Sequence, residues 1–429
     1  MKDALADFLR NQRILILGFG REGQSALRFI RQVLPDANIA VADQKPLGLN
    51  DITCFSGPDY LSQIDNYDII IKSPGIALKD QLTDAQRAKI SSCTDLFLRF
   101  CPNPIIGVTG TKGKSTTTAL THHILVNNGR HASIAGNIGK PCFDIIDELH
   151  DDSIVVLEIS AHQLEYVQAS PQVAILLNLY EEHFDHFARP DDYFAAKQHI
   201  YRYQSADDLL IYGDIFQHAN HHEIDQLPMH KIDLYRDHVV DFAKIHSHLL
   251  GEHYRYDIAA AIAACEFFGL SEAECLDAVA SFRGLPHRLE FIGEFRNIKF
   301  YNDSIATAQE ATLAALRAVP DTDTIILGGM DRGIDYRQLV DYLRHSHVRN
   351  VLLLPDTDMT IQRIFDEAPY SQNILHVADL EQAVQIAYQA TAEQHSCLLS
   401  PAAASYNQYK NFEERGNAYR QLVQRYATL

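Results

Sequence analysis

The stretch GVTGTKGKSTT, residues 107–117, decides which fold class this chain belongs to. Apolar residues 105–106 end a short strand before it, and residues 118–125 follow it with an apolar face at helical spacing. Backbone N–H groups of a glycine-rich turn at the start of a helix bind phosphate groups. We therefore predict a phosphate-binding loop, in which Lys114 reaches the β- and γ-phosphates and the Ser115 hydroxyl faces Mg²⁺.

This loop departs from the strict pattern G-x-x-x-x-G-K-[ST]. Val108 occupies the place of the first glycine, Gly107 stands one residue early, and Gly110 is an additional glycine. The alternative interpretation is a glycine-rich turn with an incidental lysine. The joint occurrence of a strand, a Gly-Lys-Ser run and a helix favours the phosphate loop.

Composition limits the class of protein. The 429 residues include 37 Lys and Arg against 56 Asp and Glu, a formal charge of −19, which disfavours nucleic acid as a partner. The length suggests two to four domains. Seven scattered cysteines without a C-x-x-C pair indicate reduced thiols. With no signal-peptide pattern and no apolar run that could span a bilayer, we expect a cytoplasmic protein without a membrane partner.

The first hundred residues carry a dinucleotide-type fingerprint. A strand at residues 13–17 runs into GFGREG at residues 18–23, a helix extends to about Val33, and a second strand ends at Asp43. Read by itself, this fingerprint binds NAD; the same turn could hold the diphosphate of another nucleotide, or the domain could hold no ligand. A further strand feeds the polar turn at residues 73–75, which belongs at the edge of such a crevice.

Two acidic or mixed clusters follow strands in the middle of the chain. Glu158 ends a strand at residues 153–160, and an acid there usually holds Mg²⁺ beside a phosphate loop. A strand at residues 173–177 leads into a stretch of acids and histidines in which His183 is the candidate metal or phosphate neighbour. Lys197 lies on a predicted helix, where the plain interpretation is a solvated surface.

The final third shows alternating strands and helices after the run GLPHRLE at residues 284–290. Predicted strands lie at residues 299–301, 323–327, 348–354 and 396–399. Polar clusters follow three of them, at residues 302–308, 328–332 and 400–405, and a loop holds polar residues from 410 to 416. Open α/β sheets bind ligands at strand carboxyl ends, so three such clusters favour a site. The charged, His-rich stretch 217–240 looks most loop-like.

Together these stretches resemble the Mur ligase family, most closely its glutamate-adding member, along nearly the whole chain. The motifs that carry the resemblance are TGTKGKS at 109–115, GNIG at 136–139, LEISAHQLE at 157–165, EHFD at 182–185, GLPHR at 284–288, NDS at 302–304, LSP at 399–401 and NFEERG at 411–416.

The resemblance implies an α/β protein of three domains. Residues 1–100 would form a Rossmann-like domain for a UDP-linked substrate, so the fingerprint would not mean NAD. Residues 101–284 would form a P-loop ATPase-like parallel sheet that binds ATP and two Mg²⁺ ions, and residues 285–429 a Rossmann-like domain that brings the amino acid. The implied substrates are UDP-N-acetylmuramoyl-L-alanine and glutamate, joined through an acyl phosphate that domain closure protects from water. We expect a monomer.

The resemblance also implies site residues. The implied ATP contacts are Gly110, Thr111, Lys112, Gly113, Lys114, Ser115, Thr116, Arg288 and Asp303. The implied metal ligands are Ser115, Glu158, His183 and Lys197, the last as a carbamate. The implied contacts to the UDP substrate are Gly18, Gly20, Arg21, Glu22, Asp43, Gln44, Ser73, Gly75 and Asn137. The implied catalytic residues are Lys114, His183, Lys197 and Asn137. The implied glutamate contacts are Thr307, Arg332, Ser405 and Phe412, where the Arg332 guanidinium would grip a carboxylate in two-pronged fashion.

Three departures from the family pattern leave alternatives open. Ile305 stands where the motif usually has lysine, Lys112 replaces an asparagine, and the adenine-side pattern reads His253-Tyr254 with Asp257 nearby. Addition of D-glutamate is the leading interpretation, and an L-glutamate-adding or other Mur-family amide ligase is the alternative. A folate-using ligase, a non-catalytic nucleotide-binding protein and an NAD-dependent oxidoreductase are more distant alternatives.

Overall fold

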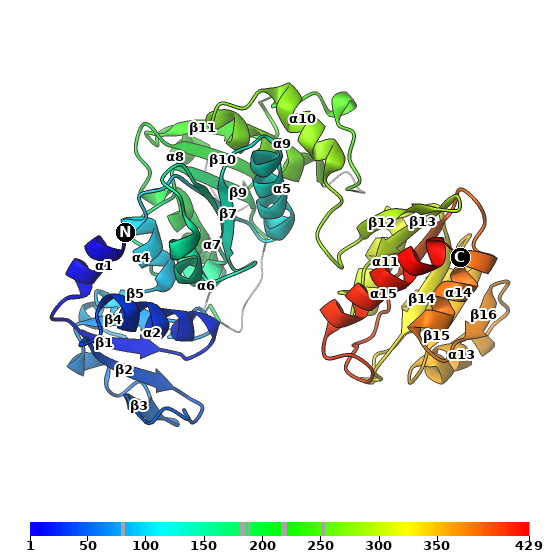
Figure 1. Cartoon of the computed structure of the whole chain (residues 1–429), viewed down its shortest axis with the longest axis horizontal. Helices are drawn as coiled ribbons and strands as arrows, with labels where there is room; N and C mark the ends of the chain where they lie inside the picture. Colours follow the sequence, from blue (N-terminus) through cyan, green and yellow to red (C-terminus); the bar gives the residue numbers. More distant parts are fainter. Residues whose placement is uncertain are drawn as a thin grey trace. The chain divides into compact units, whose positions relative to one another are not determined.

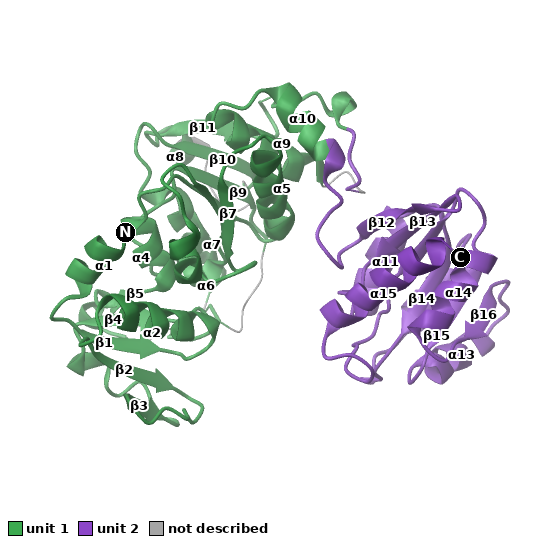
Figure 2. Ribbon diagram, viewed as in Figure 1, with its two compact units in different colours: residues 1–245, 253–279 green, residues 246–252, 280–429 purple. Residues whose placement is uncertain are grey.

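The computed structural model describes residues 1–78, 82–180, 186–187, 189–215, 221–237, 239–249 and 254–428. The chain divides into two compact units (Figure 2). Unit 1 comprises residues 1–245 and 253–279, and unit 2 comprises residues 246–252 and 280–429. Unit 1 contains two sheets and unit 2 contains one.

The first sheet of unit 1 has five parallel strands in the order β3-β2-β1-β4-β5 (Figure 1). Its strands are β1 (Arg13–Leu17), β2 (Asn38–Asp43), β3 (Thr53–Ser56), β4 (Ile69–Lys72) and β5 (Ile90–Ser91), and its helices are α1 (Lys2–Leu9), α2 (Arg21–Val33), α3 (Asp84–Arg87) and α4 (Cys93–Phe100). Because the strand order reverses beside β1, the turns after β1 and β4 face one crevice, which is where open parallel sheets bind ligands.

The second sheet of unit 1 has six parallel strands in the order β11-β10-β9-β6-β8-β7. Its strands are β6 (Ile105–Thr109), β7 (Ala132–Gly136), β8 (Ile154–Glu158), β9 (Val173–Asn178), β10 (Leu209–Asp214) and β11 (His230–Asp233). Its helices are α5 (Lys114–Asn127), α6 (Ala161–Leu164), α7 (Pro190–Arg202), α8 (His221–Asp225), α9 (Tyr254–Phe267) and α10 (Glu272–Ser281). Helix α5 packs beside α9, and α6 beside α7. The central strand β6 is buried along its whole length, as expected when helices cover both faces.

Unit 2 has six strands in the order β12-β13-β17-β14-β15-β16, parallel except for the β12–β13 hairpin (Figure 1). Its strands are β12 (Glu290–Phe295), β13 (Ile298–Asn302), β14 (Thr322–Gly328), β15 (Asn350–Leu354), β16 (Asn373–His376) and β17 (Ser396–Leu399). Its helices are α11 (Gln309–Ala318), α12 (Arg337–Arg344), α13 (Asp358–Asp366), α14 (Leu380–Ala390) and α15 (Phe412–Ala427). Strand β17 lies between β13 and β14, so the loops after these three strands leave the sheet side by side.

The predicted α/β class and the alternating pattern are confirmed, whereas two local predictions are wrong. The stretch 217–240 is not simply a loop, because it contains α8 and β11, which extends the second sheet at its edge. Residues 412–416 are not a loop either, since α15 begins at Phe412 with Asn411 as its side-chain cap. The bounds of the three predicted domains remain predictions. Among the residues that the structure describes, we find no helix long and apolar enough to cross a membrane.

Candidate active site

The phosphate loop lies between β6 and α5, as the sequence predicts. Gly110 and Gly113 adopt φ values of +152° and +86°, which favour glycine, and Gly113 directly precedes the helix. A Cβ at Gly113 would lie 2.4 Å from Oδ1 of Asp257, so the loop backbone packs directly on that carboxyl group. The Lys114 ammonium group donates to the carbonyl oxygens of Gly110 and Thr111, both at 2.9 Å. Its charge therefore lies within the loop, where a triphosphate would sit.

Neighbouring elements hold the loop in this shape. Asn178, at the end of β9, accepts from the Thr111 N–H through its carbonyl at 3.0 Å and from the Lys112 N–H through its side-chain oxygen at 2.8 Å. The Thr111 hydroxyl lies 3.1 Å from the hydroxyl of Tyr193 on α7. These hydrogen bonds hold the loop in place before a phosphate binds. Binding therefore requires no rearrangement of the backbone N–H groups that would contact the phosphate.

Lys197 on α7 is buried, with only 1% of its surface exposed, so the solvated-surface interpretation is wrong. Its Nζ donates to the Gly110 carbonyl at 2.8 Å and lies 3.4 Å from the Thr109 hydroxyl. The nearby Tyr193 ring lies under the same Nζ, 4.9 Å from it. Helix α7 therefore brings a second lysine to the base of the phosphate loop. Whether this amine becomes a carbamate stays a prediction.

Glu158 ends β8, the strand next to β6, and is 1% exposed. Its Oε1 accepts from Asn137 Nδ2 at 2.7 Å, whereas its Oε2 is buried without a hydrogen-bond partner in the described part of the chain. An unsatisfied buried carboxylate oxygen is costly unless a cation binds it, and Mg²⁺ prefers oxygen ligands. The unpartnered oxygen of Glu158 thus fits a magnesium ion, and Ser115 as a second ligand stays a prediction. His183 lies outside the described residues, and no cluster of three His, Cys, Asp or Glu side chains is found within them.

A cavity of about 390 Å³ opens at the crevice of the first sheet. It is lined by Gly18, Gly20, Arg21, Glu22, Asp43, Ser73, Pro74, Gly75, Ile76, Gly136, Asn137 and Pro141. Every residue predicted for the UDP substrate except Gln44, which is exposed, lines this cavity. Because Gly136 and Asn137 come from the second sheet, the cavity leads from the fingerprint turn to the Asn137–Glu158 hydrogen bond.

Two carboxyl groups of this cavity have distinct environments. Asp43 accepts hydrogen bonds from the backbone N–H groups of Phe19 at 2.7 Å and Lys45 at 2.9 Å, so it shapes the turn. Glu22 is partly buried; removal of its carboxyl group from water raises its pKa, and its Oε1 accepts from Gln163 Nε2 at 2.7 Å. The fingerprint glycine Gly23 is required by packing, because a Cβ there would lie 2.1 Å from the carbonyl of Gly18. This turn is therefore fixed before a ligand arrives.

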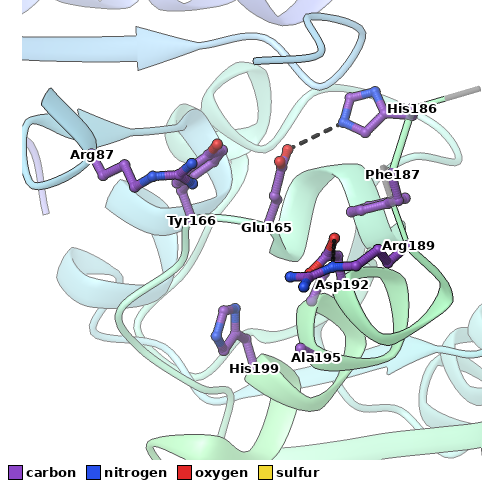
Figure 3. Close-up of a pocket in the computed structure, with 10 residues that line it drawn as sticks. Arg87, Glu165, Tyr166, His186, Phe187, Arg189, Asp192, Ala195 and His199 are labelled. Atoms are coloured by element: carbon purple, nitrogen blue, oxygen red, sulfur yellow. Dashed lines mark hydrogen bonds and ion pairs between the residues drawn. The ribbon is translucent and has the colours of Figure 1, made fainter. Parts of the chain in front are cut away.

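A second cavity of about 350 Å³ adjoins α6 and α7, and the sequence did not indicate it (Figure 3). Glu165 lies at its wall, with Oε2 3.2 Å from His186 Nε2 and 3.1 Å from the buried Nζ of Lys72. Lys72 ends β4, so this group joins the two sheets of unit 1. No pattern in the sequence indicates the Lys72–Glu165 ion pair, because the two residues lie 93 positions apart in the chain.

The predicted glutamate residues lie around the three adjacent strand ends of unit 2. Thr307 follows β13, Arg332 follows β14 and is exposed, Ser405 follows β17 and is buried, and Phe412 begins α15. The β14 and β17 loops are joined, since the Met330 N–H donates to the Ala404 carbonyl at 2.8 Å. The topology thus gathers the loops that carry all four residues.

The predicted ATP contacts of unit 2 differ in exposure. Arg288 is exposed, whereas Asp303 is buried and accepts from the Leu289 N–H at 3.1 Å and the Ser400 hydroxyl at 2.8 Å. Burial raises the pKa of Asp303 to about 7. Asp303 therefore organises the β13 and β17 loops in addition to any contact with a nucleotide.

Comparison with known proteins places this geometry in a family. Residues 108–265 match the model of the Mur ligase middle domain, and residues 287–403 match that of the Mur ligase glutamate ligase domain. The UDP-N-acetylmuramoylalanine–D-glutamate ligase of Listeria innocua is 30% identical over 450 residues, covering 97% of each chain.

Solved structures show the same fold. A UDP-N-acetylmuramoyl-L-alanyl-D-glutamate–2,6-diaminopimelate ligase superposes with a TM-score of 0.59 at 17% identity, covering 96% of this chain and 92% of that one. The MurF ligase of Thermotoga maritima in complex with ADP superposes with a TM-score of 0.52 at 15% identity, covering 99% and 96%. With a relative 30% identical along nearly its whole length, this chain belongs to the Mur ligase family.

Proposed function

We propose that this protein is an ATP-dependent ligase that adds D-glutamate to UDP-N-acetylmuramoyl-L-alanine, a step of peptidoglycan precursor synthesis. The observation that carries the proposal is the joint placement of the phosphate loop and the UDP-type cavity in unit 1, connected through Asn137 and Glu158. The D-glutamate ligase of Listeria innocua supports the choice of substrate, because the similarity extends along the whole chain. We also propose that the protein acts as a cytoplasmic monomer.

The phosphate loop and Lys114 bind and polarise ATP in this proposal. Lys114 moves from the Gly110 and Thr111 carbonyls to the β- and γ-phosphates, where it offsets the charge that spreads over the transferred phosphoryl group. Ser115 and Glu158 would hold Mg²⁺, whose charge would further neutralise the triphosphate when bound. Lys197, which lies at the base of the loop, would as a carbamate be a further ligand of Mg²⁺.

The substrate carboxylate is activated as an acyl phosphate. The UDP portion binds in the 390 Å³ cavity, with its phosphates at the start of α2, and the lactoyl-alanine arm extends toward Asn137. The carboxylate attacks the γ-phosphorus, and ADP leaves. The glutamate amine then attacks the acyl carbon, and inorganic phosphate leaves as the amide forms. Thr307, Arg332, Ser405 and Phe412 orient glutamate for that second attack.

A phosphate-release assay tests the proposal. The purified full chain is given ATP, Mg²⁺, UDP-N-acetylmuramoyl-L-alanine and either enantiomer of glutamate. We expect phosphate and a new amide product with D-glutamate, and much slower release with L-glutamate. Equal or faster turnover of L-glutamate would favour the L-glutamate-adding alternative. Failure of both enantiomers, with turnover of another amino acid, would identify a different Mur-family ligase.

A further inference from the structure

In the part of the chain that the structure describes, Arg415 is a buried cation with no carboxylate among its hydrogen-bond partners. It lies in the first turns of α15, is 1% exposed, and donates from Nε to the Ser304 hydroxyl at 3.0 Å. Its Nη2 donates to the carbonyl oxygens of Ser304 at 2.8 Å and Ala403 at 3.0 Å. All of these acceptors are neutral. Its Nη1 is buried and has no hydrogen-bond partner among the described residues.

This arrangement is energetically unfavourable by itself. Buried guanidinium groups normally pair with carboxylates, because removing a charge from water is costly. Burial lowers the pKa of Arg415 to about 10, so the group nevertheless stays protonated at neutral pH. The electrostatic interaction that opposes this shift comes from a tyrosine, Tyr409, and not from a carboxylate. Within the described ranges of unit 2, the positive charge of Arg415 is therefore not matched by a hydrogen-bonded anion.

The guanidinium group lies where three strand-end loops meet. Ser304 follows β13, Ala403 follows β17, and Gly329 follows β14, where a Cβ would lie 3.1 Å from Arg415 Nη1. These are the loops that carry Thr307, Ser405 and Arg332. The Ser304 hydroxyl links Arg415 to the start of α15, because it accepts from Arg415 Nε and donates to the Phe412 carbonyl at 2.8 Å.

We propose that Arg415 is a positioning and specificity residue for the acidic amino-acid substrate. It fastens the β13 and β17 loops to the start of α15, with the β14 loop packed against its Nη1, and its charge favours a ligand that carries a second carboxylate. This inference rests on the proposed glutamate ligase function. A purely structural clamp would explain the hydrogen bonds to neutral acceptors but would not require the charge.

The test compares Arg415→Met, Arg415→Lys and Ser304→Ala with the wild type in the phosphate-release assay. We expect Arg415→Met to raise the KM for glutamate by about tenfold or more, and the KM values for ATP and the UDP substrate to stay within about twofold. Arg415→Lys keeps the charge and should give a smaller rise. Ser304→Ala breaks the connection to Phe412 and should raise the same KM severalfold. Arg425→Met, an exposed arginine of the same helix, is the matched control.

The outcomes separate this inference from the proposed function. If all three KM values rise together, or if Lys and Met at position 415 behave alike, Arg415 is only structural. Should Arg415→Met fail to fold, Arg415→Lys and Ser304→Ala decide, and an unchanged glutamate KM in both overturns the inference. If the wild type uses a different acidic amino acid, the same comparison applies to it. A wild type that accepts only neutral amino acids refutes both the glutamate assignment and the role of Arg415.

Discussion

Lys114 and Lys197 donate hydrogen bonds to the same acceptor, the carbonyl oxygen of Gly110, at 2.9 and 2.8 Å. Lys114 begins α5 after the phosphate loop, and Lys197 comes from α7. Two ammonium groups therefore converge on one peptide oxygen at the base of the loop. A polyanion such as a triphosphate would be attracted there, and each lysine can be tested separately.

Replacement of Lys114 by alanine should abolish catalysis. The variant loses the cation that would contact the β- and γ-phosphates, so ATP-dependent phosphate release should fall by about a thousandfold or more. Lys244→Ala, which removes an exposed lysine of the same unit, should leave the rate unchanged. Unchanged turnover in Lys114→Ala would refute the assignment of the loop.

Lys197→Ala should also lose activity, and added small carboxylic acids should restore part of it. If Lys197 acts as a carbamate, its role is that of a carboxylate ligand, so acetate or formate entering the space left by the side chain should restore part of the rate. The same acids should not restore Lys114→Ala, which serves as the control. Absence of any rescue would leave Lys197 as a structural cation beneath Gly110.

Glu158→Gln is expected to weaken the binding of magnesium, so that activity requires a higher Mg²⁺ concentration. Glutamine keeps an oxygen that can accept from Asn137 but replaces the unpartnered, buried Oε2 with an uncharged group. We expect the Mg²⁺ concentration for half-maximal activity to rise by about tenfold or more, measured by titration of phosphate release with MgCl₂. Glu148→Gln, at an exposed position, is the control. The same magnesium requirement in both variants would argue against Glu158 as a ligand.

Asp257 makes stability depend on pH. Burial raises its pKa to about 8, whereas an aspartate in an unfolded chain titrates near about 4. Between these values the folded protein holds a proton that the unfolded chain releases, so stability falls as the pH rises through this window. Asp257→Asn should therefore raise the free energy of unfolding by roughly 2–3 kcal/mol more at about pH 7.5 than at about pH 5.

Urea unfolding of the wild type and Asp257→Asn at the two pH values measures this difference. Equal stabilisation at both pH values would show that Asp257 titrates normally. Above about pH 8 the wild-type Asp257 carries a negative charge against Gly113 of the phosphate loop, which should weaken ATP binding. Asp257→Asn lacks this charge and should keep its affinity for ATP.

Lys72→Met should destabilise unit 1. The Lys72–Glu165 pair is largely buried, with side-chain exposures of 2% and 18%, and loss of one partner leaves a buried charge. We expect a loss of about 3 kcal/mol in the free energy of unfolding, measured by denaturant titration. The double variant Lys72→Met/Glu165→Gln should recover much of this loss. If the double variant is as unstable as the single one, packing rather than charge explains the effect.

The sequence by itself determined the class of fold, the phosphate loop and the fingerprint turn. These features are local: apolar runs of strand length alternate with helical spacing, and glycines stand at the turns where a backbone with positive φ is needed, as at Gly113. The turns at residues 18–23 and 73–75, which line the 390 Å³ cavity, could be located for the same reason, because each is a short turn at a strand end.

Only the tertiary structure decided which polar groups are buried and which of them meet. The helical spacing of α7 could not show that Lys197 faces β6 and lies beneath Gly110. Likewise, the sequence places Arg415 far from Ser304, and the insertion of β17 between β13 and β14 brings them together. The physical reason is that burial and pairing of charges depend on packing between elements distant in the chain, which local periodicity does not encode.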